Sequence, residues 1–304
     1  MGSLGSVRLL RSLMFVPGHR PRMIDRALGR GEFASSELDV AILDLEDGVP
    51  RAEKPSARAA VAAALGRDKS EGGVGRYVRV NAGTDLRAAD LAAIVRAGLD
   101  GIVAPKIAGA NEVAALADDL EERESAAGLA RGSLRIIASI ESARGLLEAP
   151  AIAASSERII ALLFGAEDFA LDLGLPARRA AEAADLLHAR SAVVVAAVAA
   201  GRAAIDGIWP DLEDEDGLKR DALTARRLGF SGKSLIHPGQ IAAVNRIFSP
   251  SADEVEHARR IVAAFDEGSK RGDGAVALDG TLLDPPIVER ARRTLSVHSA
   301  TSRR

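Results

Sequence analysis

Acidic side chains in this 304-residue sequence stand directly after short apolar runs, where buried strands would end. Glu141 follows the run IIASI, and Asp168 follows IIALLFGAE. An unpaired carboxylate at the end of a buried strand is costly, so we expect each to have a partner or a function. Neighbouring strands lie about 4.8 Å apart, which would allow both carboxylates to reach one ion. Hard oxygen ligands suit Mg²⁺, and we therefore predict a magnesium site at Glu141 and Asp168.

Two basic residues end further apolar runs. Arg79 and Lys106 could bind the carboxylate of a substrate, and a guanidinium offers a bidentate fork for this purpose. Alternatively, both could form ion pairs with the acidic residues Asp44, Glu46 and Asp47, and for Arg79 the two roles are compatible. The three acidic residues could also simply cap the next helix.

The elements that must position these residues are Val-, Ile- and Leu-rich runs that alternate with Ala-, Arg- and Glu-rich helical stretches. This order is typical of parallel strands joined by right-handed crossovers. The predicted strands are 12–16, 40–45, 76–81, 101–106, 135–141, 159–165, 204–209 and 234–237. The predicted helices are 21–30, 53–65, 85–97, 109–127, 143–154, 178–200, 214–228 and 239–247.

Eight strand–helix units favour an α/β fold that closes into a (β/α)8 TIM barrel, because closure removes the sheet edges. All eight carboxyl ends then face one mouth, where catalysis takes place on this fold. An open doubly wound sheet is the alternative, but the sequence lacks a glycine-rich phosphate loop after the first strand. We expect a catalytic barrel domain at 1–248 and an appendage at 249–304. In the appendage we predict a capped helix at 249–265 and an extended, hairpin-like element at 272–286.

Composition excludes several classes of protein and site. A formal net charge of -3 lacks the basic excess of nucleic-acid-binding or membrane-surface proteins. The absence of cysteine excludes disulfides, thiolate metal sites and a cysteine nucleophile, and it fits a reducing compartment. The run 192–200 is shorter than the ~20 residues of a membrane helix, and Arg8 and Arg11 argue against a signal peptide. We expect a cytoplasmic protein with no nucleic-acid or membrane partner.

Nine segments, in order along nearly the whole chain, resemble the citrate lyase beta-subunit-like proteins of the HpcH/HpaI aldolase/citrate lyase superfamily. They are LMFVPGHRPRM (13–23), ILDLEDGV (42–49), RVN (79–81), APK (104–106), IES (140–142), FGAEDF (164–169), GKSLIHPGQI (232–241), FSPS (248–251) and LDGTLLDPP (278–286). The resemblance implies a TIM barrel, often a homotrimer, that uses Mg²⁺ and acts on a coenzyme A or carrier-protein thioester.

The resemblance also implies roles for individual residues. Glu141 and Asp168 match metal ligands, and Arg79 matches the arginine that meets the 2-oxo acid. Arg20 matches a position near the CoA entrance, and Asp284 matches an aspartate that works at the acyl methyl group from a neighbouring subunit. In full, the predicted catalytic residues are Asp284, Arg79, Asp47 and Glu46, and the predicted substrate-binding residues are Arg79, Gly165, Ala166, Glu167, Lys106 and Arg20.

The predicted activity is Mg²⁺-dependent cleavage or formation of a carbon–carbon bond. The substrate would be a 3-hydroxyacyl-CoA of the citryl, malyl or citramalyl type, and the products a 2-oxo acid and an acyl-CoA. Three alternatives remain open: an aldolase on free 2-oxo acids, an acyl-CoA thioesterase, and a lyase subunit active only in a complex. Ser142 stands where many relatives have threonine, which alters the surroundings of the metal, and Arg26 stands where they often have lysine. FGAEDF with a trailing ALDLG resembles a branch whose members differ in substrate, so the acyl group stays undetermined.

Overall fold

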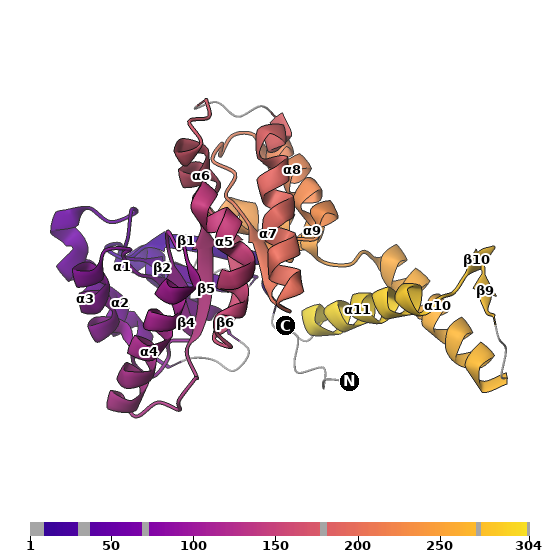
Figure 1. Ribbon diagram of the computed structural model, residues 1–304, viewed down its shortest axis with the longest axis horizontal. Coiled ribbons are helices and arrows are strands. Elements are labelled where there is room, and N and C mark those ends of the chain that lie inside the picture. The colour runs from indigo at the N-terminus through magenta and orange to yellow at the C-terminus, as the bar shows by residue number, and fades with distance from the viewer. Residues whose placement is uncertain (1–8, 30–36, 69–72, 177–180, 272–274, 303–304) are drawn as a thin grey trace. The chain divides into compact units, whose positions relative to one another are not determined.

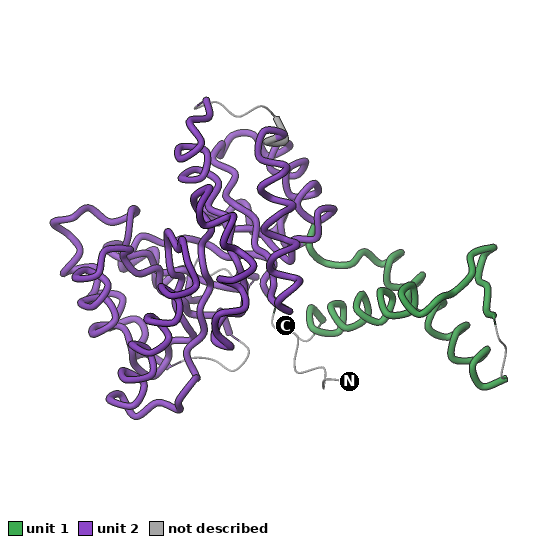
Figure 2. Tube along the Cα trace, viewed as in Figure 1, with its two compact units in different colours: residues 1–9, 246–304 green, residues 10–245 purple. Residues whose placement is uncertain are grey.

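The computed structural model describes residues 9–29, 37–68, 73–176, 181–271 and 275–302. The chain divides into two compact units, coloured separately in Figure 2. The larger unit runs from Leu10 to Asn245, and the smaller one contains the C-terminal part from Arg246 onward. Each unit is described by itself below.

The larger unit is a closed barrel of eight parallel strands, β1 to β8, paired in sequence order with β8 returning to β1. This confirms the predicted (β/α)8 fold. The strands are β1 (Ser12–Pro17), β2 (Val40–Asp44), β3 (Gly75–Arg79), β4 (Gly101–Ala104), β5 (Arg135–Ile140), β6 (Ile159–Phe164), β7 (Ala203–Asp206) and β8 (Gly232–Leu235).

Helices surround the barrel (Figure 1), so the strands are covered on both faces and read as nearly continuous apolar runs. The helices are α1 (Pro21–Ala27), α2 (Lys54–Leu65), α3 (Thr84–Ile94), α4 (Ala110–Ala126), α5 (Ala143–Ala154), α6 (Ala166–Asp172), α7 (Leu187–Ala199), α8 (Glu215–Leu228) and α9 (Ile241–Phe248). Short 3-10 turns occur at Arg51–Glu53, Ala181–Leu186 and Pro238–Gln240. The innermost side chains form a single apolar cluster: Leu10, Leu13, Val40, Ile42, Tyr77, Val103, Ile137, Ala161, Leu163 and Ile205.

The structure departs from the prediction most clearly at β8, at α7 and at α6. Strand β8 begins at Gly232, two residues before the predicted start, because Lys233 is buried with carboxylate partners and does not end the strand. A side chain at Gly232 would meet the Leu10 carbonyl oxygen at 1.7 Å, so only glycine fits there. The helix predicted at 178–200 becomes a 3-10 turn followed by α7, and residues 178–180 of it lie outside the described residues. Helix α6, directly after β6, was not predicted.

The smaller unit contains a helix, a short antiparallel hairpin and a second helix. They are α10 (Ala252–Arg271), β9 (Ala277–Leu278) with β10 (Thr281–Leu282), and α11 (Pro285–Ser302). The hairpin matches the predicted extended element, but α11 was missed. Pro285 and Pro286 were included in the predicted extended element, whereas they form the first turn of α11, where a missing N–H costs nothing. The two helices share an apolar core that includes Ile261, Leu283 and Val288.

Among the described helices, none combines the length and the apolar character needed to span a bilayer.

Candidate active site at the carboxyl ends of the strands

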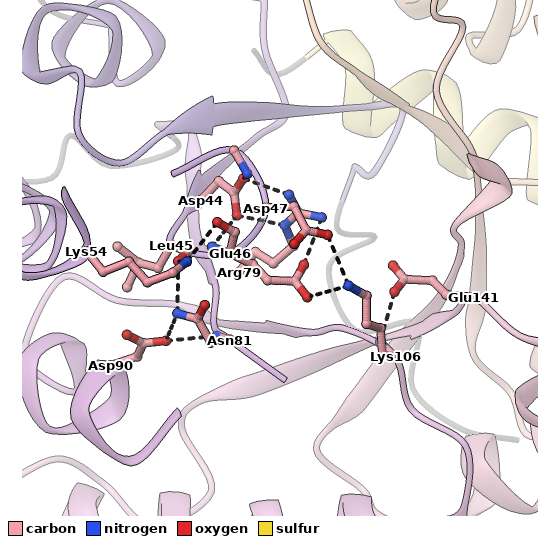
Figure 3. A network of polar contacts seen from close by, with 11 residues as sticks. Asp44, Leu45, Glu46, Asp47, Lys54, Arg79, Asn81, Asp90, Lys106 and Glu141 are labelled. Atoms are coloured by element: carbon pink, nitrogen blue, oxygen red, sulfur yellow. Dashed lines mark hydrogen bonds and ion pairs between the residues drawn. The ribbon is translucent and has the colours of Figure 1, made fainter. Parts of the chain in front are cut away.

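Alternation along the strands brings the predicted polar residues to the inside of the barrel at one end. Successive side chains of a strand point to opposite faces, so residues two apart share a face. Ile42, Tyr77 and Ile137 belong to the innermost cluster. Continuing each strand by two or four residues reaches Asp44, Arg79 and Glu141. The carboxyl ends of β2, β3 and β5 therefore present these three side chains at the mouth of the barrel, together in Figure 3.

Asp44 and Arg79 form a bidentate ion pair at the mouth. Nε and Nη2 of Arg79 donate to the two carboxylate oxygens of Asp44 at 2.7 and 2.6 Å. The same oxygens accept the N–H groups of Glu46 at 2.8 Å and Gly48 at 2.9 Å. A side chain at position 48 would lie 2.3 Å from Oδ2 of Asp44, so glycine is required for this turn. The guanidinium also lies over the Phe15 ring, 4.7 Å from its centre.

Glu46 joins the two basic residues of the site. Its carboxylate oxygens lie 3.2 Å from Nη1 of Arg79 and 3.2 Å from Nζ of Lys106. Lys106 reaches Asp47 as well, at 3.0 Å. Glu46 is buried, whereas Asp47 and Lys106 are exposed. The alternative interpretation of Arg79 and Lys106, as partners of Asp44, Glu46 and Asp47, therefore describes this structure. These ion pairs are compatible with substrate binding by Arg79, because an arginine has five N–H donors.

Glu141 is held between β4 and β6. Lys106 has a φ of 55°, a left-handed conformation that costs a non-glycine residue about 1–3 kcal/mol. In this conformation its N–H donates to Oε2 of Glu141 at 3.0 Å. A side chain at Gly165 would lie 2.2 Å from Cγ of Glu141, so this glycine makes room for the Glu141 side chain.

Negative charge is in excess around Glu141. Its burial, followed by the charges of Glu46 and Asp168, raises the pKa of Glu141 to about 7, although Arg79 and the Lys106 N–H lower it. Burial also raises the pKa of Glu46, with Asp47 adding to the effect and Arg79 and Lys106 opposing it. Repulsion between the Glu141 and Asp168 carboxylates is what a divalent cation bound by both would relieve.

The donor set at this position fits magnesium. Within the described part of the chain, no three Asp, Glu or His side chains gather as a ready metal cluster. Mg²⁺ does not need one, because it is commonly bound through one or two carboxylates while water and substrate oxygens complete its octahedron. Glu141 and Asp168 would supply two such oxygen ligands, and Glu141 is the buried one whose charge is opposed by its acidic neighbours.

The remaining predicted residues are divided between the two units. Ala166 and Glu167 begin α6 beside Asp168, and Arg20 is exposed just before α1, which follows β1. Asp284 belongs to the smaller unit. It is exposed at the start of α11, where its carboxylate accepts the N–H of Ile287 at 3.1 Å and so caps the helix.

The sequence analysis missed part of this site. Asp44 was predicted as an ion-pair partner of the basic residues or as a helix cap, and it also organises the turn after β2 by accepting the N–H groups of Glu46 and Gly48. Lys54 and Asn81, which donate to the backbone of that turn, were given no role. Asn81 could have been found as the polar residue two positions after Arg79, whereas no pattern in the sequence marks Lys54.

Asp206, the last residue of β7, does not join this site. Ile205 points into the barrel, so its neighbour Asp206 points outward to the helices. There it is buried in a group of four charges with Arg190 of α7, Asp221 of α8 and Lys233 of β8.

Comparison with known proteins places this barrel in a family. A sequence profile of the family described as HpcH/HpaI aldolase/citrate lyase matches residues 11–238. The citrate lyase subunit beta of Leuconostoc mesenteroides subsp. cremoris is 37% identical over 302 residues, which cover 98% of this chain and 96% of the relative. The mitochondrial citramalyl-CoA lyase of Rattus norvegicus is 32% identical, with 94% of this chain and 85% of the relative covered. A (3S)-malyl-CoA thioesterase of Cereibacter sphaeroides is 36% identical, with 94% and 93% covered.

A solved structure agrees with the sequence matches. The protein CitE of Mycobacterium tuberculosis, in complex with magnesium, acetoacetate and coenzyme A, superposes with a TM-score of 0.75 and is 34% identical, with 95% of this chain and 98% of that chain covered. The predicted family is confirmed by these matches, which extend over nearly the full length. The chain belongs to the HpcH/HpaI aldolase/citrate lyase family.

Proposed function

We propose that this protein is a Mg²⁺-dependent carbon–carbon lyase for a 3-hydroxyacyl-CoA of the citryl, malyl or citramalyl type. The observation that carries the proposal is the barrel mouth itself, where Glu141 and Asp168 lie beside an arginine already fixed by Asp44. A cation site next to a rigid guanidinium suits a 2-oxo acid, which carries a carboxylate and an adjacent carbonyl. The relatives named above, with their citrate lyase and citramalyl-CoA lyase activities, support the same reaction class.

The reaction needs one bond cleavage and two proton movements. The bond between the second and third carbons breaks, the 3-hydroxyl loses its proton to become the carbonyl of the 2-oxo acid, and the second carbon gains a proton. Bound Mg²⁺ would supply Lewis acidity at the carbonyl and carboxylate oxygens of the acid. Arg79 would hold the acid's carboxylate, while Glu46 and Asp47 fix Arg79 and Lys106. Gly165, Ala166 and Glu167, at the start of α6, would line the substrate side, and Arg20 would lie near the CoA entrance.

Asp284 is proposed as the general acid/base at the acyl carbon, supplied by a neighbouring copy in a homo-oligomer such as a trimer. Its exposure at the start of α11 supports this role. Mixing Glu141→Ala and Asp284→Asn chains, each inactive alone, after unfolding and reassembly should restore activity at about a quarter of the sites, because the two halves of each site are drawn at random. Each variant reassembled alone should stay inactive. No recovery in the mixture, when wild type recovers fully, would exclude a shared site.

The proposed lyase activity is tested by its products. Purified protein is incubated with Mg²⁺ and citryl-, malyl- or citramalyl-CoA, and the products are separated and identified by mass. We expect equal amounts of oxaloacetate, glyoxylate or pyruvate and of the matching acyl-CoA from at least one substrate. Free CoA with an intact hydroxy acid would instead identify a thioesterase, the alternative favoured by the Cereibacter sphaeroides relative.

Two other outcomes are informative. Condensation of free 2-oxo acids without CoA would identify an aldolase of the other branch of the family. Activity that appears only when partner subunits are added would identify a lyase subunit that works in a complex.

We also propose a cytoplasmic location, supported by the absence of cysteine and by CoA thioester chemistry. Cell fractionation should recover the protein with cytosolic enzymes, and recovery from a secreted or membrane fraction would contradict this.

A further inference from the structure

Lys54 is a buried lysine whose position is not explained by an ion pair. It begins α2, and 8% of its surface is exposed. Its ammonium donates to the backbone carbonyl oxygens of Leu45 at 2.7 Å and Glu46 at 3.0 Å. Among the described residues, no carboxylate lies within ion-pair distance of it. Burial of a cation is costly, so a cation satisfied only by two carbonyl groups indicates that those carbonyls must be held in place.

The same carbonyl of Leu45 also accepts a hydrogen bond from Asn81. Nδ2 of Asn81 donates to Leu45 O at 2.9 Å and to Asp90 at 2.7 Å, and its backbone N–H donates to Asp90 at 2.8 Å. Asp90, on α3, is in turn fixed by Arg58 of α2 at 2.7 Å. Figure 3 shows Lys54, Asn81 and Asp90 behind the turn, on the side away from Glu141.

These contacts act on the peptide groups that carry the site's acidic side chains. Leu45 O and Glu46 O belong to the peptide groups on either side of Glu46, so their direction sets where the Glu46 carboxylate points. Glu46 then meets both Arg79 and Lys106. We propose that Lys54, assisted by Asn81, is a positioning residue that fixes the turn after β2 and thereby orients Arg79 for the substrate carboxylate. This inference rests on the proposed function for its last step only.

Amide hydrogen exchange tests the first step without any ligand. The amides of Glu46 and Gly48 donate to Asp44 in the turn. In Lys54→Met, which keeps the side-chain stem but removes the donors, these two amides should exchange at least about tenfold faster, while amides of β5 and β6 keep their rates. Unchanged exchange at Glu46 and Gly48 would overturn the inference. Asn81→Ala, which removes the other donor to Leu45 O, should also speed the exchange of these two amides. It replaces Lys54→Met in the experiment if that variant does not fold.

Ligand binding tests the second step. In Lys54→Met, the Kd of the Mg²⁺-dependent complex with oxaloacetate, pyruvate or glyoxylate, whichever wild type binds, should rise about 10- to 100-fold, as is typical when a supporting partner behind a binding residue is removed. Mg²⁺ affinity in the absence of the acid should change little, because Lys54 contacts the turn after β2 and neither Glu141 nor Asp168.

A double-mutant cycle separates positioning from loss of stability. If Lys54 acts through Glu46, Lys54→Met should have almost no further effect on acid binding in a Glu46→Gln background. Arg11→Met is the matched control, because it removes a part-buried ion pair with Asp39 at the amino end of the barrel. It should lower stability without affecting acid binding. Additive effects of Lys54→Met and Glu46→Gln would contradict the proposed route. If wild type binds no 2-oxo acid at all, the proposed function fails, and the exchange experiment still decides the role of Lys54.

Discussion

Arg79→Lys is expected to weaken binding of the 2-oxo acid by about 10- to 150-fold, the equivalent of one lost hydrogen bond to a charged group at 1.5–3 kcal/mol. Lysine keeps the charge but lacks the planar fork, so it cannot hold Asp44 through two nitrogens and face a carboxylate at the same time. Isothermal titration with glyoxylate, pyruvate and oxaloacetate in the presence of Mg²⁺ measures the change.

The control for Arg79→Lys is Arg11→Lys. Arg11 also binds an aspartate through Nε and Nη2, at 3.0 and 2.8 Å, but at the opposite end of the barrel. Both variants lose a bidentate ion pair, but only Arg79→Lys should bind the 2-oxo acid more weakly. Normal binding of all three acids by Arg79→Lys would show that Arg79 has a structural role alone.

Lys233→Met is expected to reduce the free energy of unfolding at neutral pH by about 3–5 kcal/mol, because it leaves an uncompensated charge in the protein interior. Lys233 is 1% exposed, and its ammonium lies 2.6 Å from Asp206 and 2.5 Å from Asp221. Arg190 would remain as the only basic member of the group, facing two carboxylates. Denaturant unfolding measures the loss.

The loss should depend on pH with a defined sign. In the wild type, burial favours the protonated form of Asp206, but Lys233 and Arg190 outweigh it and keep the pKa of Asp206 below its ordinary value. That depressed pKa stabilises the wild type at neutral pH, and the contribution disappears as the pH falls through it. Without Lys233 the pKa of Asp206 should rise, so that the folded variant binds a proton more readily than the unfolded chain. The difference in stability should therefore be largest near pH 7 and smaller at mildly acidic pH.

Two variants check this interpretation. Asp221→Asn in the Lys233→Met background restores the charge balance and should recover part of the lost stability. Lys219→Met removes a lysine that also contacts two carboxylates, Glu215 and Asp216, but on the exposed face of α8, and it should leave stability nearly unchanged. A Lys233→Met protein that unfolds at the wild-type denaturant concentration would contradict the account of this group.

The barrel and much of its mouth could be predicted from the sequence because apolar runs end at polar residues. The apolar runs of β2, β3 and β5 end at the charged residues Asp44, Arg79 and Glu141. This switch from apolar to charged residues marks both the end of the strand and the site. Alternation along the strand also decides which face a residue occupies. Applied to Ile205, it would have placed Asp206 outside the barrel.

Other features leave no pattern in the sequence. Lys54 binds two backbone carbonyls, and such contacts put no constraint on neighbouring residue types. The left-handed conformation of Lys106 is a property of the assembled site, since lysine has no preference for it. Pro285 and Pro286 are compatible with either an extended segment or the first turn of a helix, and the apolar positions of α11 that pack on α10 decide for the helix.

The central claim is that Glu141 and Asp168 bind the magnesium ion of a lyase site. Titration of Mg²⁺ into wild type, Glu141→Gln and Asp168→Asn tests it most directly, with Asp118→Asn as the control. Asp118 is an exposed carboxylate in the middle of α4, so this control removes the same charge away from the carboxyl ends of the strands. We predict that wild type and Asp118→Asn bind Mg²⁺ alike, and that each of the other two variants binds about 10-fold more weakly or worse, as expected for the loss of a charged ligand. Wild-type Mg²⁺ affinity in both Glu141→Gln and Asp168→Asn would contradict the claim.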